Sequence, residues 1–264
     1  MRRRFFVERF KDSAAVLHGE AANHLARVLR AEPGQLYELS DGESLWLART
    51  EAVDRDAVEF ALVERLPALL PSQRITLLLA IVKFDRFEWA IEKATELGAD
   101  EIVPLAAERS EKGLVAASAK RAARWKKILL ESAQQSRRLR VPVLHDAAIP
   151  HEAFVAESSD LRLLLSERGG AKPMRELLEP ERPALENRGP VSLAFAIGPE
   201  GGWTDAELAA AAGSGFAEAS VGINILRTET AVCAALAAAQ YAFGACRQPD
   251  GLRSVRGKGR AGKP

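Results

Sequence analysis

The sequence predicts an α/β fold in which helices cover both faces of a parallel sheet, preceded by a small, mostly β module. From residue 74 onward, short apolar runs alternate with amphipathic segments of helical period, which is the pattern of parallel strands joined by crossover helices. Before residue 70, short segments of alternating polarity are separated by turn signals at Pro33-Gly34 and Asp41-Gly42. Because 47% of the 264 residues are hydrophobic, the chain has enough apolar material for a sizeable core.

The N-terminal module is expected to contain strands at residues 35–39 and 57–63. A helix is predicted at residues 20–30, where an apolar stripe recurs at helical spacing, formed by Ala22, Leu25, Val28 and Leu29. Residues 66–72 break both periods and are predicted to be a linker. We therefore expect one domain over residues 1–71, a second over 72–247, and a disordered basic tail over 248–264.

In the second domain, strands and helices are predicted to alternate. Strands are expected at residues 75–82, 101–105, 161–165, 191–197 and 217–221, and helices at 86–97, 120–138, 173–178, 204–212 and 229–245. Gly98 is expected to cap the first of these helices at its C-terminus. Ligands of such sheets bind beyond the carboxyl ends of the strands, so the loops after Leu165, Ile197 and Val221 are the candidate sites.

The loop after Ile197 carries three glycines and a proline within residues 198–202, which favours close approach of a ligand to exposed backbone. The alternative is an ordinary strand-to-helix turn, for which one glycine would suffice. Thr204 is predicted to be the N-cap of the next helix, with Glu207 completing a capping box. No Gly-Lys-Ser/Thr follows, so this is not a phosphate loop.

The loop after Val221 contains two apolar residues, Ile225 and Leu226, where a purely structural loop would be polar. They either plug the core or line a pocket for an aromatic ligand. Arg227 beside them could cap the following helix, bind a phosphate or steady an anionic substrate. The residues alone leave these alternatives open.

The net charge of +1 conceals three basic segments, at residues 2–11, 120–140 and 253–263. Any one of them could be an ordinary solvated face. Three in a chain near charge balance favour a polyanionic partner, and nucleic acid is the leading candidate. The tail also matches a dinucleotide-binding fingerprint at residues 257–262, but no strand precedes it, so a nicotinamide-dependent oxidoreductase is disfavoured.

Several other classes are excluded by the sequence. No apolar run approaches the ~20 residues that cross a bilayer, and the first residues lack the features of a secretory signal, so we expect a cytoplasmic protein without a membrane partner. The two cysteines, Cys233 and Cys246, are too few for a disulfide framework. Neither has Cys or His neighbours at metal-ligand spacing, so no metal site is expected.

Seven segments together resemble the RsmE family, the small-subunit ribosomal RNA uridine-N3 methyltransferases of the SPOUT superfamily. They are RFF at residues 4–6, HLARVLR at 24–30, KATELG at 93–98, ERS at 108–110, QQS at 134–136, IGPEGG at 197–202 and ILRTETA at 225–231. The likeness spans nearly the whole chain before the tail, and the order and spacing of the segments are highly specific. The chain departs from the family at Val221, where leucine is usual, and at Asn224, where a basic residue is common.

The resemblance implies a PUA-like β-barrel for RNA over residues 1–71 and a SPOUT methyltransferase domain with a deep C-terminal trefoil knot over 72–247. Pattern rules alone would assign an open doubly wound sheet, because chains rarely thread loops. The family's homodimers bind S-adenosylmethionine in the knot and methylate uracil N3 of a uridine in 16S ribosomal RNA. This chain is therefore expected to do the same within the small ribosomal subunit.

Residue roles are expected from the resemblance together with the position of the loops and of the basic segments. Donor-binding candidates are Leu165, Ser166, Glu167, Ile197, Gly198, Pro199, Glu200, Gly201, Gly202, Val221, Gly222, Ile225, Leu226 and Thr230. Arg227 is the candidate for stabilising the uracil anion, and Glu229 and Glu200 are candidates for proton handling or donor orientation. RNA-binding candidates are Arg2, Arg3, Arg4, Arg27, Arg30, Arg109, Lys126, Lys127, Gln134, Arg137 and Arg138.

Two other functions remain compatible with the sequence. A 2′-O-ribose methyltransferase of the same superfamily would have a similar donor pocket. A non-catalytic ribosomal-RNA-binding assembly factor could share the fold without binding the donor.

Overall fold

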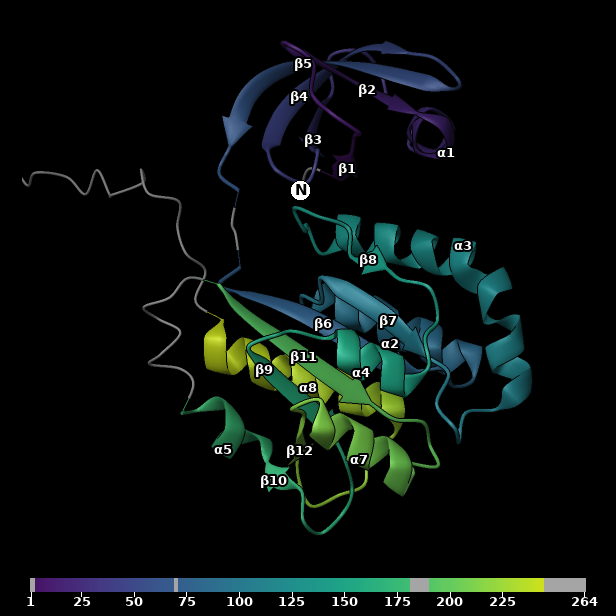
Figure 1. Cartoon of the computed structure of the whole chain (residues 1–264). Helices are drawn as coiled ribbons and strands as arrows, with labels where there is room; N and C mark the ends of the chain where they lie inside the picture. Colours follow the sequence, from purple (N-terminus) through teal and green to yellow (C-terminus); the bar gives the residue numbers. More distant parts are fainter. Residues whose placement is uncertain (1–2, 69–70, 181–189, 245–264) are drawn as a thin grey trace, which may run out of the picture.

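Two sheets, one on either side of residue 70, organise the chain (Figure 1). The computed structural model describes residues 3–68, 71–180 and 190–244. The predicted tail at 248–264, Cys246 and Arg2 lie outside these described residues. Cys233 lies half-buried in the last described helix.

The N-terminal sheet has five strands: β1 (Arg4–Phe6), β2 (Ala14–His18), β3 (Leu36–Ser40), β4 (Leu45–Val53) and β5 (Ala57–Leu66). Their order is β1-β3-β4-β5-β2, with β1 parallel to β3 and the other pairs antiparallel. Alternate residues face inward, so Val58 and Phe60 of β5 are buried while Glu59 is exposed. They pack in a core of their own with Leu25 and Leu39.

The helix predicted at residues 20–30 is regular only over α1 (Gly19–Asn23), and a π-helical turn, η1 (His24–Val28), follows it. The wider turn, closed by a bond from the Leu29 amide to the His24 carbonyl (3.1 Å), rotates later residues away from the core. Leu25 is fully buried, whereas the Val28 side chain is 65% exposed. The predicted stripe is therefore wrong at Val28.

The second sheet has seven strands in the order β10-β12-β9-β11-β6-β7-β8, and every neighbouring pair is parallel. The strands are β6 (Gln73–Ala80), β7 (Glu101–Leu105), β8 (Val143–Leu144), β9 (Leu161–Leu165), β10 (Lys172–Pro173), β11 (Val191–Ile197) and β12 (Ala217–Ser220). The helices are α2 (Phe84–Glu96), α3 (Lys112–Gln135), α4 (Pro150–Ala156), α5 (Met174–Leu178), α7 (Asp205–Gly213) and α8 (Thr228–Phe243).

Helices cover both faces of this sheet, which confirms the predicted α/β fold. Strand β6 shows the division, because Ile75, Leu77 and Leu79 share a core with α2, α3, α5 and α8, whereas Leu78 and Ala80 share one with α4 and α7. In Figure 1, α3 lies between the N-terminal sheet and the rest of the second domain. Within the described residues, no helix is long and apolar enough to cross a membrane.

The element predictions differ from the structure mainly in short or weakly patterned segments. The strands at 101–105, 161–165 and 191–197 are confirmed to the residue. Helix α3 begins at Lys112 rather than residue 120, because residues 112–119 include Gly113 and Ser118 and show little apolar period. Helix α4 and strands β1, β2, β4, β8 and β10 were not predicted, and all of these except the nine-residue β4 have at most seven residues.

Helix α2 ends as predicted. Gly98 follows it with φ of 96°, a left-handed conformation that glycine adopts readily, and the Ala99 amide reaches back to the Ala94 carbonyl (2.9 Å). The Gln240 side chain of α8 donates to the Leu97 carbonyl (2.8 Å). The end of α2 is thereby fastened to α8.

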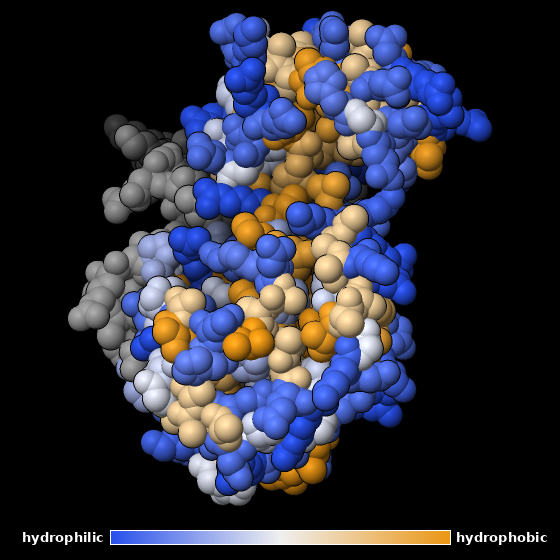
Figure 2. All heavy atoms as spheres, turned by 45° about the vertical axis from the view of Figure 1, so that its right-hand side comes forward, coloured by the Kyte–Doolittle hydropathy of each residue, from blue (hydrophilic) through white to orange (hydrophobic). Residues whose placement is uncertain are grey.

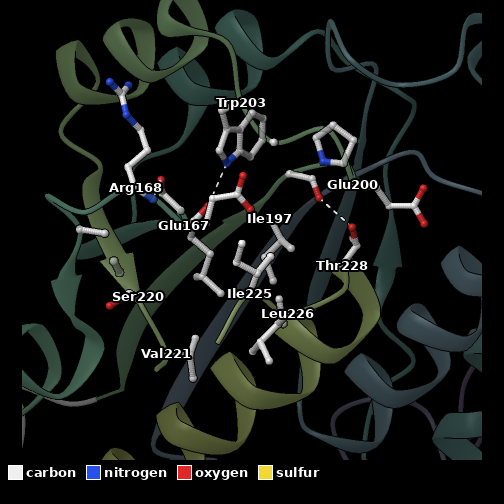
Figure 3. A pocket seen from close by; sticks show the side chains of 18 of the residues that line it. Glu167, Arg168, Ile197, Glu200, Trp203, Ser220, Val221, Ile225, Leu226 and Thr228 are labelled. Carbon is white, nitrogen blue, oxygen red and sulfur yellow. Dashed lines mark hydrogen bonds between the residues drawn. The ribbon is translucent and has the colours of Figure 1, made fainter. Parts of the chain in front are cut away.

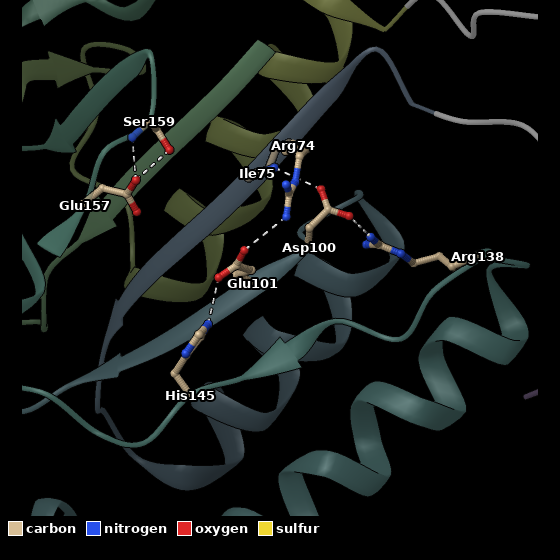
Figure 4. A network of polar contacts seen from close by, with 8 residues as sticks. All are labelled: Arg74, Ile75, Asp100, Glu101, Arg138, His145, Glu157 and Ser159. Carbon is tan, nitrogen blue, oxygen red and sulfur yellow. Dashed lines mark hydrogen bonds and ion pairs between the residues drawn. The ribbon is translucent and has the colours of Figure 1, made fainter. Parts of the chain in front are cut away.

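A polar network links the amino ends of β6 and β7 to the segment after α3 (Figure 4). The Asp100 carboxylate accepts from the Ile75 amide (3.0 Å) and from the Arg138 guanidinium (2.7 Å). The neighbouring Glu101 pairs with Arg74 (3.4 Å) and His145 (2.8 Å). Burial raises the pKa of Asp100, and the facing Arg138 opposes that rise. The network therefore depends on Arg138 as the counter-charge of a half-buried carboxyl group.

We expect Gly98→Ala to destabilise the fold more than Gly34→Ala. Both glycines have positive φ, so each alanine should cost about 1–2 kcal/mol. A Cβ at residue 98 would also collide with the Gln240 amide and break its bond to Leu97, adding about 1 kcal/mol, whereas nothing lies within 4 Å of a Cβ at residue 34. Urea unfolding of both variants measures the difference. Equal losses would contradict the role given to Gln240.

Candidate functional site

Three loops meet at the carboxyl edge of the second sheet and enclose a cleft of about 760 Å³ (Figure 3). They follow β9, β11 and β12, which are the strands whose ends were singled out from the sequence. The three strands are adjacent in the order β12-β9-β11, so their carboxyl ends are neighbours. The three candidate loops therefore lie together at one cleft.

The glycines of the loop after β11 allow two large side chains to approach its backbone. A Cβ at Gly198 would come within 3.0 Å of the Trp203 indole, and one at Gly201 within 3.3 Å of Arg109. Gly202 has φ of 70° and donates to the Pro199 carbonyl (2.8 Å), which closes the turn. This loop needs its glycines for close packing, beyond what a simple turn requires.

Trp203 connects the loop after β11 to the end of β9. Its indole N–H donates to the Leu165 carbonyl (3.0 Å), and its ring packs edge-on against Phe154 of α4. Thr204 then forms the predicted capping box with Glu207, which also accepts from the Glu108 amide (2.9 Å). The loop after β11, which forms one wall of the cleft, is thus hydrogen-bonded to the end of β9 and, through Glu207, to the segment after β7.

The first turn of α8 forms the opposite wall. The buried Thr228 hydroxyl donates to the Gly198 carbonyl (3.0 Å), as Figure 3 shows. The preceding loop exposes its apolar side chains, since Ile225 is 76% and Leu226 37% exposed. Both line the cleft, so they are not core plugs.

Arg86, on the first turn of α2, forms an ion pair with Glu200 and lies 4.0 Å from the Glu229 carboxylate. One oxygen of Glu229 is buried with no hydrogen-bond partner. These contacts bring the glycine-rich loop, α8 and α2 together beside the cleft. The cation was missed because α2 is more than 100 residues distant in sequence from both carboxylates.

Most predicted donor-binding residues line the cleft. These are Leu165, Ser166, Glu167, Ile197, Gly198, Pro199, Glu200, Gly202, Val221, Gly222, Ile225 and Leu226. Gly201 packs behind the lining against Arg109, and Thr230 is exposed outside it. Arg227 is the exposed N-cap residue of α8, but its side chain makes no capping bond. Lining residues that sequence reasoning missed include Arg168, Trp203, Ser220 and Thr228.

The predicted RNA-binding residues fall into two groups. Arg3, Arg27, Arg30 and Lys126 are exposed. The others contact protein groups, although Arg109 and Lys127 are exposed as well: Arg4 with Glu38, Arg109 with the Gly201 carbonyl, Lys127 with Glu20, Arg137 with Glu38, and Arg138 with Asp100. Gln134 is half-buried near the end of α3. Basic character alone did not separate surface cations from those engaged in structure.

The site is therefore a backbone-lined cleft with an apolar floor and charged rim. Glu167 and Glu200 supply negative charge, and Arg109 and Arg168 supply positive charge. Among the described residues, no group of three His, Cys, Asp or Glu side chains is placed to hold a metal ion. Such a cleft suits a small organic ligand with both apolar and charged parts.

Comparisons with known proteins identify the family. Residues 70–240 match the family model described as RNA methyltransferase domain. The chain is 32% identical over 236 residues to ribosomal RNA small subunit methyltransferase E of Synechocystis, covering 87% of this chain and 74% of that protein. The Mycobacterium tuberculosis protein of the same name is 31% identical, with 89% of each chain covered.

A solved structure extends the likeness to three dimensions. The crystal structure of a ribosomal RNA small subunit methyltransferase E from Neisseria gonorrhoeae, bound to S-adenosyl methionine, superposes with a TM-score of 0.80. It is 30% identical in sequence, and the match covers 91% of this chain and 98% of that one.

We expect Trp203→Phe to destabilise the protein by about 1–3 kcal/mol, because the Leu165 carbonyl would lose its buried donor. Trp89→Phe is the matched control, since Trp89 is 44% exposed on α2 and should change stability by less than about 0.5 kcal/mol. Denaturant unfolding of both variants tests this. Equal stability of the two would show that the indole N–H contributes nothing.

Proposed function

Because this chain belongs to the RNA methyltransferase family, we propose that it transfers a methyl group from S-adenosylmethionine to uracil N3 of a specific uridine in 16S ribosomal RNA. The observation that carries the proposal is the cleft formed by the three adjacent strand ends. The relatives named as small-subunit methyltransferases support the RNA substrate. The RsmE-like motifs at residues 93–98, 197–202 and 225–231 support the N3 position.

The residues of the cleft fit the donor. Its volume of about 760 Å³ is within the usual range of about 300–1,000 Å³ for small-molecule sites. Ile225 and Leu226 offer apolar surface for an adenine ring, and the backbone at 198–202 offers peptide groups for its polar edge. Glu167 and Glu200 carry charge opposite to a sulfonium. When bound, S-adenosylmethionine supplies an electrophilic methyl group.

The residues around the donor act mainly by holding and shielding. Methyl transfer is an in-line displacement, so the attacking nitrogen must be aligned within a few ångströms and water kept out. The hydrogen bonds of Trp203 and Thr228 hold the walls of the cleft in place. Uracil N3 also lies on the pairing edge, so the target base must be unpaired or flipped before it can enter.

The proton on uracil N3 must be removed or begin to leave before the nitrogen attacks. We assign Arg227 to stabilise the resulting uracil anion, because it is exposed between two residues that line the cleft, Leu226 and Thr228. Glu200 and Glu229 are the candidates for accepting the proton or orienting the donor, and Arg86 holds both near the same point.

The finer architecture is part of the proposal. Strand β12 joins the sheet outside β9, and α8 then returns to pack on β11 and α2, which supports a C-terminal trefoil knot. The mixed five-stranded sheet supports a PUA-like barrel that binds RNA through the exposed Arg3, Arg27 and Arg30.

The oligomeric state and the location are also part of the proposal. The exposed apolar side chains of Ile223 and Tyr241 support a homodimer. The ribosomal substrate supports a cytoplasmic location.

The proposal predicts N3-methyluridine when the full-length protein and S-adenosylmethionine are incubated with small subunits lacking the modification. Mass spectrometry of the digested RNA locates and identifies the product. A 2′-O-methylated nucleoside would establish the rival reaction. No donor binding in a calorimeter would favour a non-catalytic assembly factor.

Loss of the Arg227 cation should slow transfer without weakening donor binding. We expect Arg227→Ala to lower kcat by about 100-fold, the order of effect of removing one charge-stabilising group, and Arg227→Lys to restore part of it. Single-turnover kinetics with saturating RNA measure the step, and calorimetry checks donor affinity. An unchanged rate in Arg227→Ala would exclude the assignment.

A further inference from the structure

The N-terminal sheet meets the second domain at the segment of residues 137–140, which follows α3. We call this segment the joint. The Ser40 hydroxyl donates to the Leu139 carbonyl (2.7 Å), and the Arg140 guanidinium donates to the Gly42 carbonyl. In the view of Figure 2, apolar residues gather in the band where the upper, N-terminal lobe meets the lower one.

Arg4 of β1 makes two hydrogen bonds across the joint and is held on its own side by Glu38 of β3. Its guanidinium donates to the Glu38 carboxylate through Nε (3.1 Å) and Nη2 (2.8 Å). Through Nη1 it donates to the carbonyls of Arg137 (2.5 Å) and Arg138 (3.1 Å). The Arg4 side chain is only 9% exposed, so it has little surface to offer a phosphate.

The carbonyls that Arg4 holds belong to a tightly shaped turn. Arg137 has φ of 56°, a left-handed conformation that costs free energy in a non-glycine residue. The next residue, Arg138, donates to the Thr95 carbonyl (2.9 Å), the Ala99 carbonyl (2.5 Å) and the Asp100 carboxylate (2.7 Å). The joint is thereby attached to the C-terminal end of α2.

Helix α2 carries the connection to the cleft. Its 13 residues span about 20 Å, and its first turn bears Arg86, the partner of Glu200 at the cleft rim. One rigid element thus contacts the joint at one end and the glycine-rich loop at the other. The orientation of the N-terminal sheet relative to the cleft depends on the fit at the joint.

We propose that Arg4 is a positioning residue for the transfer reaction: it fixes the RNA-binding module relative to the donor cleft and does not itself contact RNA. This inference rests on the proposed function. A target nucleotide held by one module must reach a donor held by the other. An error of about 1 Å in that geometry is enough to cost about 100-fold in rate.

The decisive pair of variants is Arg4→Lys and Arg55→Lys in the full chain. Both keep the positive charge, so a phosphate contact would survive in either. A lysine at residue 4 has no planar fork to bond a carboxylate and two carbonyls together. We expect Arg4→Lys to lower kcat/KM for small subunits by about 10- to 100-fold, and Arg55→Lys, at an exposed residue of the same module that is given no role in RNA binding, to leave it unchanged.

The variant Glu38→Gln distinguishes an RNA-contacting role of Arg4 from a positioning role, because the two roles predict opposite effects on the reaction. If Arg4 contacted RNA, removing the adjacent carboxylate would tighten RNA binding. If Arg4 positions the module, losing its partner lowers kcat/KM as Arg4→Lys does. Wild-type kcat/KM in Arg4→Lys, or tighter RNA binding in Glu38→Gln, would overturn the proposal.

Calorimetric titration with S-adenosylmethionine shows that each variant is folded and gives the concentration of competent sites. The dissociation constant for the donor should match that of the wild type in all variants.

If Arg4→Lys does not fold, Ser40→Ala takes its place, because it removes a hydrogen bond across the joint at a fully buried residue without changing the charge. It should lower kcat/KM by about tenfold, and wild-type kcat/KM there would overturn the proposal. Failure of the proposed function itself would appear in the wild type, as absent donor binding or absent product.

Discussion

The adjacency of β12, β9 and β11 is the constraint on which the cleft depends. Parallel strands bring their carboxyl ends to one edge of the sheet, so the three loops that follow these strands lie together although they come from distant parts of the sequence. Their proximity does not require contacts between their side chains. Backbone hydrogen bonding fixes that edge, and the hydrogen bonds of Trp203 and Thr228 then hold the walls of the cleft in place. Methyl transfer suits such a frame, because it requires alignment more than it requires reactive side chains.

The central strands of the second domain could be predicted from the sequence because they are short apolar runs bounded by turn residues. Strands β7, β9 and β11 were located to the residue for this reason. The π-helical turn after Asn23 and the short helix α4 could not be found, since a local register change and a seven-residue helix leave no distinct period. The strand-end rule placed the loops of the site, and the resemblance to RsmE proteins supplied their expected ligand.

Charge was the least informative property of the sequence. Arg4 and Arg138 look like surface cations in the printed chain, yet both are partly or wholly buried among carbonyls and carboxylates. Arg86, in contrast, sits in an ordinary amphipathic helix and carried no local signal, although it holds two carboxylates beside the cleft. A guanidinium reveals its role only through the geometry of its acceptors, and those come from tertiary contacts.

The late position of helix α8 in the sequence determines when the cleft can form during protein synthesis. It is the last helix that the structure describes, and it completes the cleft through Thr228 and fastens α2 through Gln240. During synthesis the N-terminal sheet, which ends at Leu66, has left the ribosome long before this helix emerges. The N-terminal module of the nascent chain can therefore fold well before the cleft for the methyl donor is complete.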